Sequence, residues 1–178
     1  NNLCVMLMAG QGKRLKSLDK NKFLIPYKNK PIYKHVLSQY NSKKNIIITN
    51  NELKKKVLNQ KSVELFFVEK NNSMFKTILE SSKLLNAHDK YILTSCDCFG
   101  EFDIKKLKNI SKKKIDLCLF GFKFSNLQTK LNNAHTQIVT EKHAVKDIKV
   151  KSKYNSMLLG HAGFFWINSK KVFGYFEN

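Results

Sequence analysis

The sequence predicts an α/β fold with a mostly parallel sheet, and three observations lead to this prediction. Through the first half of the chain, short apolar runs alternate with helical patterns in the order β-α-β-α-β-α-β, which is typical of parallel strands joined by right-handed crossovers. The run from Leu3 to Met8 is continuously apolar, as in a strand that is buried on both faces. The 178 residues, 42% of them hydrophobic, are enough for one domain with a substantial core.

The elements of the first half follow in order from local patterns. Pro31 is expected to open a helix, because proline suits the first helical position. One face of this helix is apolar: Ile32, Val36, Leu37 and Tyr40. A later helix is expected to begin near Ser73, a candidate N-cap, and to turn five residues inward: Phe75, Ile78, Leu79, Ser82 and Leu85. Strands are expected at residues 46–48, 63–68 and 91–94, and another helix at 52–59.

The second half of the chain is rich in predicted strands. They cover residues 115–124 and 158–167, with a hairpin formed by 137–140 and 145–150, and a closing helix is expected at 169–176. These strands are expected to build a lid or an acceptor-side lobe. No Gly/Ser-rich or Pro-rich linker divides the chain, so residues 1–178 are interpreted as one domain.

The charge of the chain limits the classes of function. The formal charge of +20 comes from 33 basic and 13 acidic residues, and such a field attracts nucleic acid, anionic membranes or phosphate-bearing small molecules. The basic residues are 32 Lys and a single Arg, a bias that a low-GC genome explains. Arg is the usual residue for base and phosphate recognition, so the sequence argues against a specific nucleic-acid partner.

Apolar runs and cysteines bear on the location of the protein. No apolar run approaches the roughly 20 residues of a membrane span. The four cysteines, at positions 4, 96, 98 and 118, form no spaced disulfide framework. A reducing, cytoplasmic location is therefore expected.

The strongest chemical signal is the segment Leu7-Met8-Ala9-Gly10-Gln11-Gly12-Lys13-Arg14-Leu15, which is followed by Lys22. Two glycines after a buried strand allow a tight turn whose backbone N–H groups can hold an oxyanion. Lys13 and Arg14 place cations beside that turn. The spacing fits neither the Walker A loop nor G-x-G-x-x-G. Ligands of such sheets bind beyond the carboxyl ends of the strands, where this segment and Asp97 both lie. A surface turn with solvated charges is the alternative interpretation.

This segment resembles the A-A-G-x-G-[TS]-R-[LM]…P-K signature of nucleotidyltransferases related to sugar-1-phosphate nucleotidylyltransferases. Further matches follow in the family's order over residues 3–173: Asn29-Lys30-Pro31, Ser95-Cys96-Asp97-Cys98-Phe99, Val145 to Lys151, and His161-Ala162-Gly163-Phe164-Phe165-Trp166. The resemblance implies a Rossmann-like three-layer sandwich with a mostly parallel, mixed sheet, which is the GT-A-like nucleotidyltransferase fold. It also implies a reaction that joins a nucleoside triphosphate to a sugar 1-phosphate, or a similar phosphomonoester, with release of pyrophosphate.

The resemblance also implies roles for individual residues. Arg14 and Lys22 would be catalytic, because they stabilise charge on the transferring phosphoryl group, and Asp97 would bind Mg²⁺. Lys151 and Gly163 would lie on the acceptor side. The nucleotide would be bound by Leu7, Ala9, Gly10, Gln11, Gly12, Lys13 and Ser73. For Ser73, N-capping alone is an alternative, and for Asp97 the alternative is a cap on the turn through Phe99 and Gly100.

The sequence departs from the family pattern at several positions. Lys13 occupies the position where the family has Thr or Ser, and Asn21 the position of the family's Pro. Val150 replaces the family's Glu, and His161 replaces its Asn. The family's second metal-binding aspartate has no counterpart before Asn178, so a domain truncated at its C-terminus, or a short form, is expected. For His161, a hydrogen-bonded structural role is favoured over a catalytic one.

The predicted function is that of an enzyme, a nucleotidylyltransferase for cell-surface polysaccharide synthesis. Its partners would be a nucleoside triphosphate and a phosphorylated small-molecule acceptor, and a homo-oligomer is left open. A catalytically impaired nucleotide-binding regulatory domain is one alternative. A glycosyltransferase of the same fold is another, although Cys96-Asp97-Cys98 is not the D-x-D of such enzymes.

Overall fold

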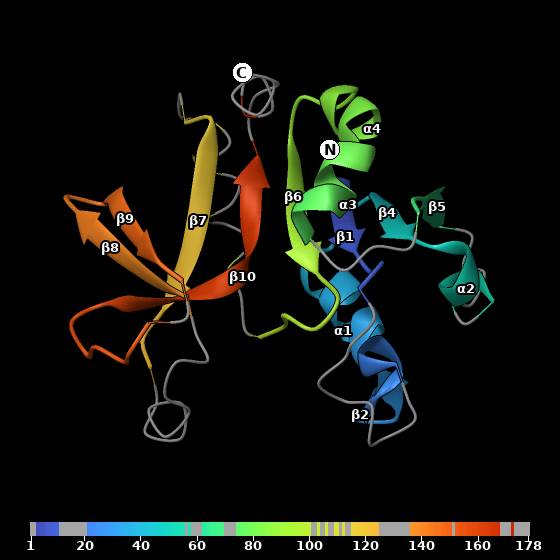
Figure 1. Ribbon diagram of the computed structural model, residues 1–178, viewed down its shortest axis with the longest axis horizontal. Coiled ribbons are helices and arrows are strands. Elements are labelled where there is room, and N and C mark those ends of the chain that lie inside the picture. Colours follow the sequence, from blue (N-terminus) through green and yellow to red (C-terminus); the bar gives the residue numbers. More distant parts are fainter. Residues whose placement is uncertain are drawn as a thin grey trace. The chain divides into compact units, whose positions relative to one another are not determined.

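The computed structural model describes residues 3–10, 21–55, 57, 62–69, 74–100, 103, 106, 109–110, 112, 115–124, 136–150, 152–167 and 172. The chain forms two compact units (Figure 1). The first unit contains Asn1–Cys118 and Phe165–Asn178, and the second contains Leu119–Phe164. None of the described helices has the length and apolar character that a membrane span requires.

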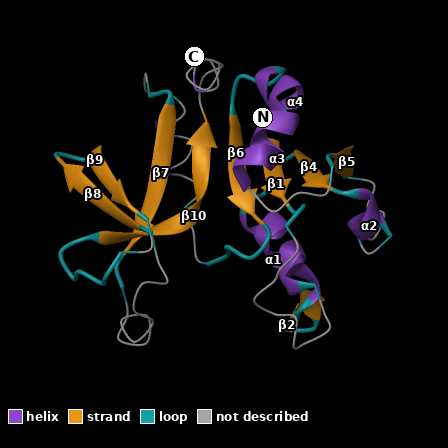
Figure 2. Ribbon diagram, viewed as in Figure 1, coloured by secondary structure: helices purple, strands orange, loops and turns teal. Residues whose placement is uncertain are grey.

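The sheet of the first unit is parallel, as predicted. Its strands are β1 (Leu3–Leu7), β4 (Lys44–Thr49), β5 (Val63–Phe67) and β6 (Tyr91–Ser95), in the order β5-β4-β1-β6. Each neighbouring pair in this order runs parallel. All five residues of β1 are buried, because this strand lies in the middle of the sheet with helices against it (Figure 2).

Two sets of helices pack on the two faces of this sheet. Leu3, Val5 and Leu7 belong to a core cluster that also contains Leu85 of α4 (Ser82–Asn86) and packs against Ile78 of α3 (Met74–Glu80). The alternate side chains of the strands face α1 (Ile32–Gln39), whose C-cap residue Tyr40 donates a hydrogen bond to Thr94 of β6 at 3.3 Å. The arrangement confirms the predicted α/β fold with helices on both sides of the sheet.

The helix α1 begins one residue later than predicted. Pro31 is its N-cap residue, and it also closes the short strand β3 (Lys30–Pro31), which pairs with β2 (Pro26–Tyr27). The buried residues near this helix are Tyr33, Val36, Leu37 and Tyr40, whereas Ile32 is only partly buried. The hairpin β2–β3 and the preceding 3₁₀ helix η2 (Lys22–Leu24) were not predicted.

The predicted inward face of residues 73–85 is wrong at two positions. Phe75 and Leu79 are 53% and 42% exposed, and Thr77 is buried instead. The predicted single helix is divided into α3 and α4 at Ser81, which is fully buried. Ser81 Oγ donates to the carbonyl of Thr77 at 2.6 Å, so the hydroxyl of this buried serine is satisfied by the backbone of the preceding turn.

The remaining first-half elements follow the prediction with shifted ends. The helix predicted at 52–59 is described as α2 (Asn51–Lys54), and residues 56 and 58–61 lie outside the described part of the chain. Asn50 is the N-cap of α2, because its side chain accepts a hydrogen bond from the Leu53 N–H at 3.1 Å. The predicted closing helix at 169–176 lies outside the described residues except for Val172.

The second unit contains an antiparallel hairpin and most of two further strands. The predicted hairpin is present as β8 (Gln137–Glu141) and β9 (Ala144–Lys149), and β10 (Leu159–Ile167) pairs with β8 and with β7 (Leu117–Phe122). Gln137 is 1% exposed, and its amide bonds the loop at 152–155: Nε2 lies 2.6 Å from Ser152 Oγ, and Oε1 accepts from the Asn155 N–H at 2.9 Å. The buried amide of Gln137 therefore holds the loop that leads into β10.

The turn of the β8–β9 hairpin has an uncommon sequence. Lys142 and His143 both have positive φ, 48° and 70°, as the two central residues of a type I′ turn require. Asn-Gly is the preferred pair there, because L side chains are strained at positive φ. Changing Lys142-His143 to Asn-Gly is therefore expected to raise the free energy of unfolding by about 1 kcal/mol, and thus the melting temperature by about 2–4 °C.

Lys142→Ala is the matched control for this change, because it removes the long side chain and keeps the strained backbone. It is expected to bring no stabilisation, as followed by calorimetry. An equal rise in melting temperature for both variants would show that the side chains, and not the turn backbone, are responsible.

Candidate active site

The carboxyl ends of β1 and β6 meet at one edge of the sheet. The two strands pair in parallel, with Leu7 opposite Ser95. The segments that follow, Met8 to Gly10 and Cys96 to Asp97, therefore leave the sheet side by side. The sequence predicted this juxtaposition, and ligand sites of parallel sheets lie at such edges.

The exit of β1 is fixed by hydrogen bonds to the neighbouring strand. The Met8 N–H donates to the carbonyl of Ile48 at 2.8 Å, and the side chain of Asn50 donates to the carbonyl of Ala9 at 3.1 Å. Leu7 and Ala9 are buried, whereas Gly10 is exposed, and an added Cβ at Gly10 would meet no atom within 4 Å. The side chains of Leu7 and Ala9 are therefore withdrawn from solvent, and Gly10 is the first exposed residue of this segment.

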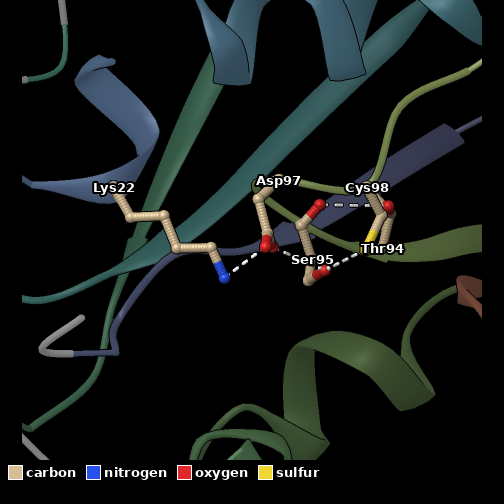
Figure 3. Close-up of polar contacts among 5 residues, drawn as sticks. All are labelled: Lys22, Thr94, Ser95, Asp97 and Cys98. Carbon is tan, nitrogen blue, oxygen red and sulfur yellow. Dashed lines mark hydrogen bonds and ion pairs between the residues drawn. The ribbon is translucent and has the colours of Figure 1, made fainter. Parts of the chain in front are cut away.

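Lys22 and Asp97 form an ion pair at this edge (Figure 3). Lys22 Nζ contacts Asp97 Oδ2, and the side chains are 38% and 27% exposed. The other carboxylate oxygen, Oδ1, lies 3.1 Å from the hydroxyl of Ser95, which also lies 2.9 Å from Cys98 Sγ. Lys22, one of the two residues predicted as catalytic, and Asp97, the residue predicted as a metal ligand, are therefore in direct contact.

The alternative role predicted for Asp97, capping of the turn through Phe99 and Gly100, is not observed at the Gly100 N–H. The Gly100 N–H donates to Gln39 Oε1 at 3.0 Å, and Gln39 Nε2 donates to the carbonyl of Cys98 at 3.0 Å. Gln39 lies at the end of α1. The segment after Asp97 is thus held by a helix, which leaves the carboxylate for Lys22 and Ser95.

The two cysteines beside Asp97 are unsuited to thiolate chemistry. Burial raises the pKa of Cys96 to about 12, and the negative charge of Asp97 raises it further. Burial also raises the pKa of Cys98. Both thiols are therefore protonated at neutral pH, and all four cysteines of the chain are free. The described residues contain no group of three His, Cys, Asp or Glu side chains that could hold a metal ion.

Several predicted site residues lie outside the described part of the chain: Gln11, Gly12, Lys13, Arg14, Ser73 and Lys151. Gly163 is described and lies in β10, in the second unit, with φ of 77°. This φ gives a backbone reason for glycine at that position. Nearby, burial lowers the pKa of His161, although the backbone of Phe164 acts in the opposite direction. His161 is consequently neutral at pH 7.

Sequence reasoning missed Asn50, Ser95 and Gln39. Asn50 and Ser95 had a detectable signal, because each is a small polar residue at the carboxyl end of a predicted parallel strand. Gln39 had none, since an amide on a partly polar helix is usually solvated and its contacts are 59 and 61 residues away.

Comparisons with known proteins bear on the family and on the fold. The family model of the MobA-like NTP transferase domain matches residues 4–103. No curated protein sequence matches the chain. A protein from Bacillus anthracis, provisionally described as a glucose-1-phosphate thymidylyltransferase and bound to a sucrose, is similar with a TM-score of 0.81 at 17% identity, over 99% of this chain and 75% of that one.

Two further solved structures are similar over nearly the whole chain. The inositol-1-phosphate CTP transferase from T. maritima gives a TM-score of 0.75 at 20% identity, over 97% of this chain and 72% of its own. HddC from Yersinia pseudotuberculosis, complexed with GMP-PN, gives 0.71 at 20% identity, over 97% of this chain and 78% of its own. At these identities the likeness shows the fold, a mixed parallel and antiparallel sheet with helices, and confirms the predicted fold class.

Proposed function

The chain belongs to the family of MobA-like NTP transferase domains, and from this premise we propose that it is a nucleotidylyltransferase acting on a phosphorylated small molecule. The proposed reaction joins a nucleoside triphosphate to a sugar 1-phosphate or a similar phosphomonoester. An acceptor phosphate oxygen attacks the α-phosphorus, a new P–O bond forms, and the bond to the β-phosphate breaks to release pyrophosphate. The observation that carries the proposal is the Lys22–Asp97 pair at the edge where β1 ends.

The acceptor class is supported by similar proteins of known structure. One is described as acting on glucose 1-phosphate and another on inositol 1-phosphate, and both acceptors are phosphomonoesters. HddC, a protein with this fold, is complexed with GMP-PN. We therefore propose a phosphomonoester as the acceptor. The nucleotide sugar or related product would feed cell-surface polysaccharide synthesis in the cytoplasm, where the four free cysteines stay reduced.

The residues at the site fit a divalent cation of the Mg²⁺ type. Asp97 offers carboxylate oxygens at a partly exposed position, and Oδ2 already contacts a cation, the ammonium group of Lys22. Magnesium prefers oxygen ligands and takes only one or two from protein, the others coming from water and phosphate. When bound, it would neutralise phosphate charge and polarise the phosphoryl oxygens. Asp97 would hold it, with Ser95 orienting the carboxylate through Oδ1.

Lys22 is proposed to act on the triphosphate. Its ammonium group is placed by η2 and faces the edge where β1 ends. Phosphoryl transfer depends mainly on positioning and on charge stabilisation, and a lysine supplies both without proton transfer. Arg14 is proposed to act beside it, and Gln11, Gly12, Lys13 and Ser73 are proposed to bind the nucleotide. Lys151 and Gly163 are proposed for the acceptor.

Pyrophosphate release tests this proposal. Each of the four common nucleoside triphosphates is combined with glucose 1-phosphate, mannose 1-phosphate, inositol 1-phosphate and phosphocholine, with Mg²⁺ or with EDTA. We expect release for at least one pair, only in the presence of the metal. Nucleotide binding without release in any combination would overturn the proposal in favour of a regulatory nucleotide-binding domain. Transfer of sugar from a nucleotide sugar would favour a glycosyltransferase.

A further inference from the structure

Gln39 contacts the main chain on both sides of Phe99, close to Asp97. Its Nε2 donates to the carbonyl of Cys98, and its Oε1 accepts from the N–H of Gly100, each at 3.0 Å. These two groups belong to consecutive peptide units. One amide side chain therefore fixes both peptide planes, because an amide offers a donor and an acceptor at a fixed separation.

The residue next to Gln39 holds the other end of the same segment. The hydroxyl of Tyr40 donates to Thr94 Oγ1 at 3.3 Å, and both residues are buried. Thr94 lies in β6, and Asp97 lies between Thr94 and the two peptide units that Gln39 fixes. Two consecutive residues at the end of α1 thus bracket the segment that carries Asp97.

The ring of Phe99 adds a third attachment to α1. It stacks on His35 with centroids 5.7 Å apart and lies 5.1 Å from the ring of Tyr27. His35 Nε2 in turn contacts the carbonyl of Tyr27 at 2.7 Å. Phe99 is the residue between the two peptide units that Gln39 contacts, so its ring and the Gln39 amide hold the same segment.

The same helix also anchors the segment that carries Lys22. The Ile32 N–H donates to the carbonyl of Ile25 at 3.0 Å, just after η2, and the ring of Tyr33 packs edge-on against Phe23 at 6.1 Å. Helix α1 is therefore a common support for both partners of the ion pair.

From these contacts we infer that Gln39 is a positioning residue for the metal ligand Asp97. The inference rests on the proposed function. Gln39 touches no reacting group, and it acts through the backbone of Cys98 and Gly100. Residues that orient a metal ligand typically contribute 10- to 100-fold to metal affinity or activity. We expect the variants of Gln39 to change the metal dependence of the reaction more than the stability of the fold.

The test uses Gln39→Leu, which keeps the size of the side chain and removes both hydrogen bonds. At saturating nucleotide, the Mg²⁺ concentration needed for half-maximal pyrophosphate release is expected to rise about tenfold, with little change in the KM of the acceptor. Hydrogen exchange of the peptide spanning residues 96–100 should become faster, because the Gly100 N–H loses its acceptor. This second measurement needs neither substrate nor metal.

Two more variants sharpen the result. Gln39→Glu keeps the acceptor for the Gly100 N–H and loses the donor for the Cys98 carbonyl. The Gly100 N–H should therefore stay protected from hydrogen exchange, while the Mg²⁺ dependence of pyrophosphate release should still be impaired. Ser38→Ala is the control, because the Ser38 hydroxyl bonds only to the carbonyl of His35 within the helix. An unchanged Mg²⁺ dependence in an active Gln39→Leu protein would overturn the inference. If wild-type protein itself releases no pyrophosphate, the proposed function fails, while the exchange measurement still reports on the Gln39 contacts.

Discussion

Asp97→Asn is expected to lower Mg²⁺-dependent turnover by about 10³-fold while the fold stays intact. The asparagine keeps an oxygen that can accept from Ser95 and removes the negative charge. Metal affinity depends on that charge, because a neutral amide oxygen is a much weaker ligand for Mg²⁺ than a carboxylate. Pyrophosphate release as a function of Mg²⁺ concentration, with Mn²⁺ binding followed by water proton relaxation, measures both effects.

The stability of this variant separates a metal ligand from a structural aspartate. The ion pair with Lys22 is partly exposed, and such pairs contribute about 1 kcal/mol or less. Unfolding in urea should therefore change by no more than that amount. Glu64→Gln is the matched control, because it removes a carboxylate from a comparable pair with Lys44 on strands β4 and β5. A large loss of stability with a normal Mg²⁺ response would show that Asp97 is structural.

Lys22→Met is expected to change turnover and metal binding in opposite directions. Turnover should fall by about 10²- to 10³-fold, the usual effect of losing one positioned charge-stabilising group. In the absence of nucleotide, however, Mn²⁺ should bind about tenfold more tightly, because the ammonium group no longer competes for Asp97 Oδ2. Water proton relaxation with Mn²⁺ alone measures the second effect.

The control for this variant is Lys44→Met. Lys44 pairs with Glu64 at 2.7 Å and lies at the beginning of β4, opposite Leu3, which begins β1. It therefore belongs to the edge of the sheet away from the site, and it should alter neither turnover nor Mn²⁺ binding. A Lys22→Met protein with full activity would show that this lysine does not act on the triphosphate. Weaker Mn²⁺ binding in the same protein would show that Lys22 supports the metal site rather than competing with it.

The parallel sheet could be predicted because its strands are short apolar runs that can be recognised from the local sequence. The central strand β1 is a continuous apolar run and β4 has three consecutive isoleucines, because both strands are buried on both faces, and such runs can be recognised without knowledge of the neighbouring strands. The shared edge of the segments after β1 and β6 could be predicted for a related reason. Once β1 and β6 are parallel neighbours, the residues that follow them must leave from the same edge.

The parts that could not be predicted depend on contacts distant in sequence. Phe75 and Leu79 are apolar and therefore predicted to be buried, yet they are exposed, and Thr77 and Ser81 are buried in addition to the predicted Leu85. Residue type misleads here, since the Ser81 hydroxyl is satisfied by the helix itself. Hairpin β2–β3 carries Lys28 and Asn29 at positive φ, without the glycine that usually marks such a turn. The pairing of Lys22 with Asp97 joins residues 75 positions apart, and no local pattern encodes it.

The discontinuity of the first unit has a consequence for how the chain is made. Its hydrophobic cluster joins Val5, Ile48 and Leu93 to Ile167 and Val172, while Leu119–Phe164 form the other unit. A ribosome delivers the chain from its N-terminus, so the last core residues of the larger unit emerge only after the whole smaller unit has been synthesised. Within the smaller unit the β8–β9 hairpin can form early, since it needs only neighbouring residues. Until Ile167 and Val172 emerge, the nascent sheet exposes apolar surface, and this interval is when the protein is most open to aggregation or to chaperones.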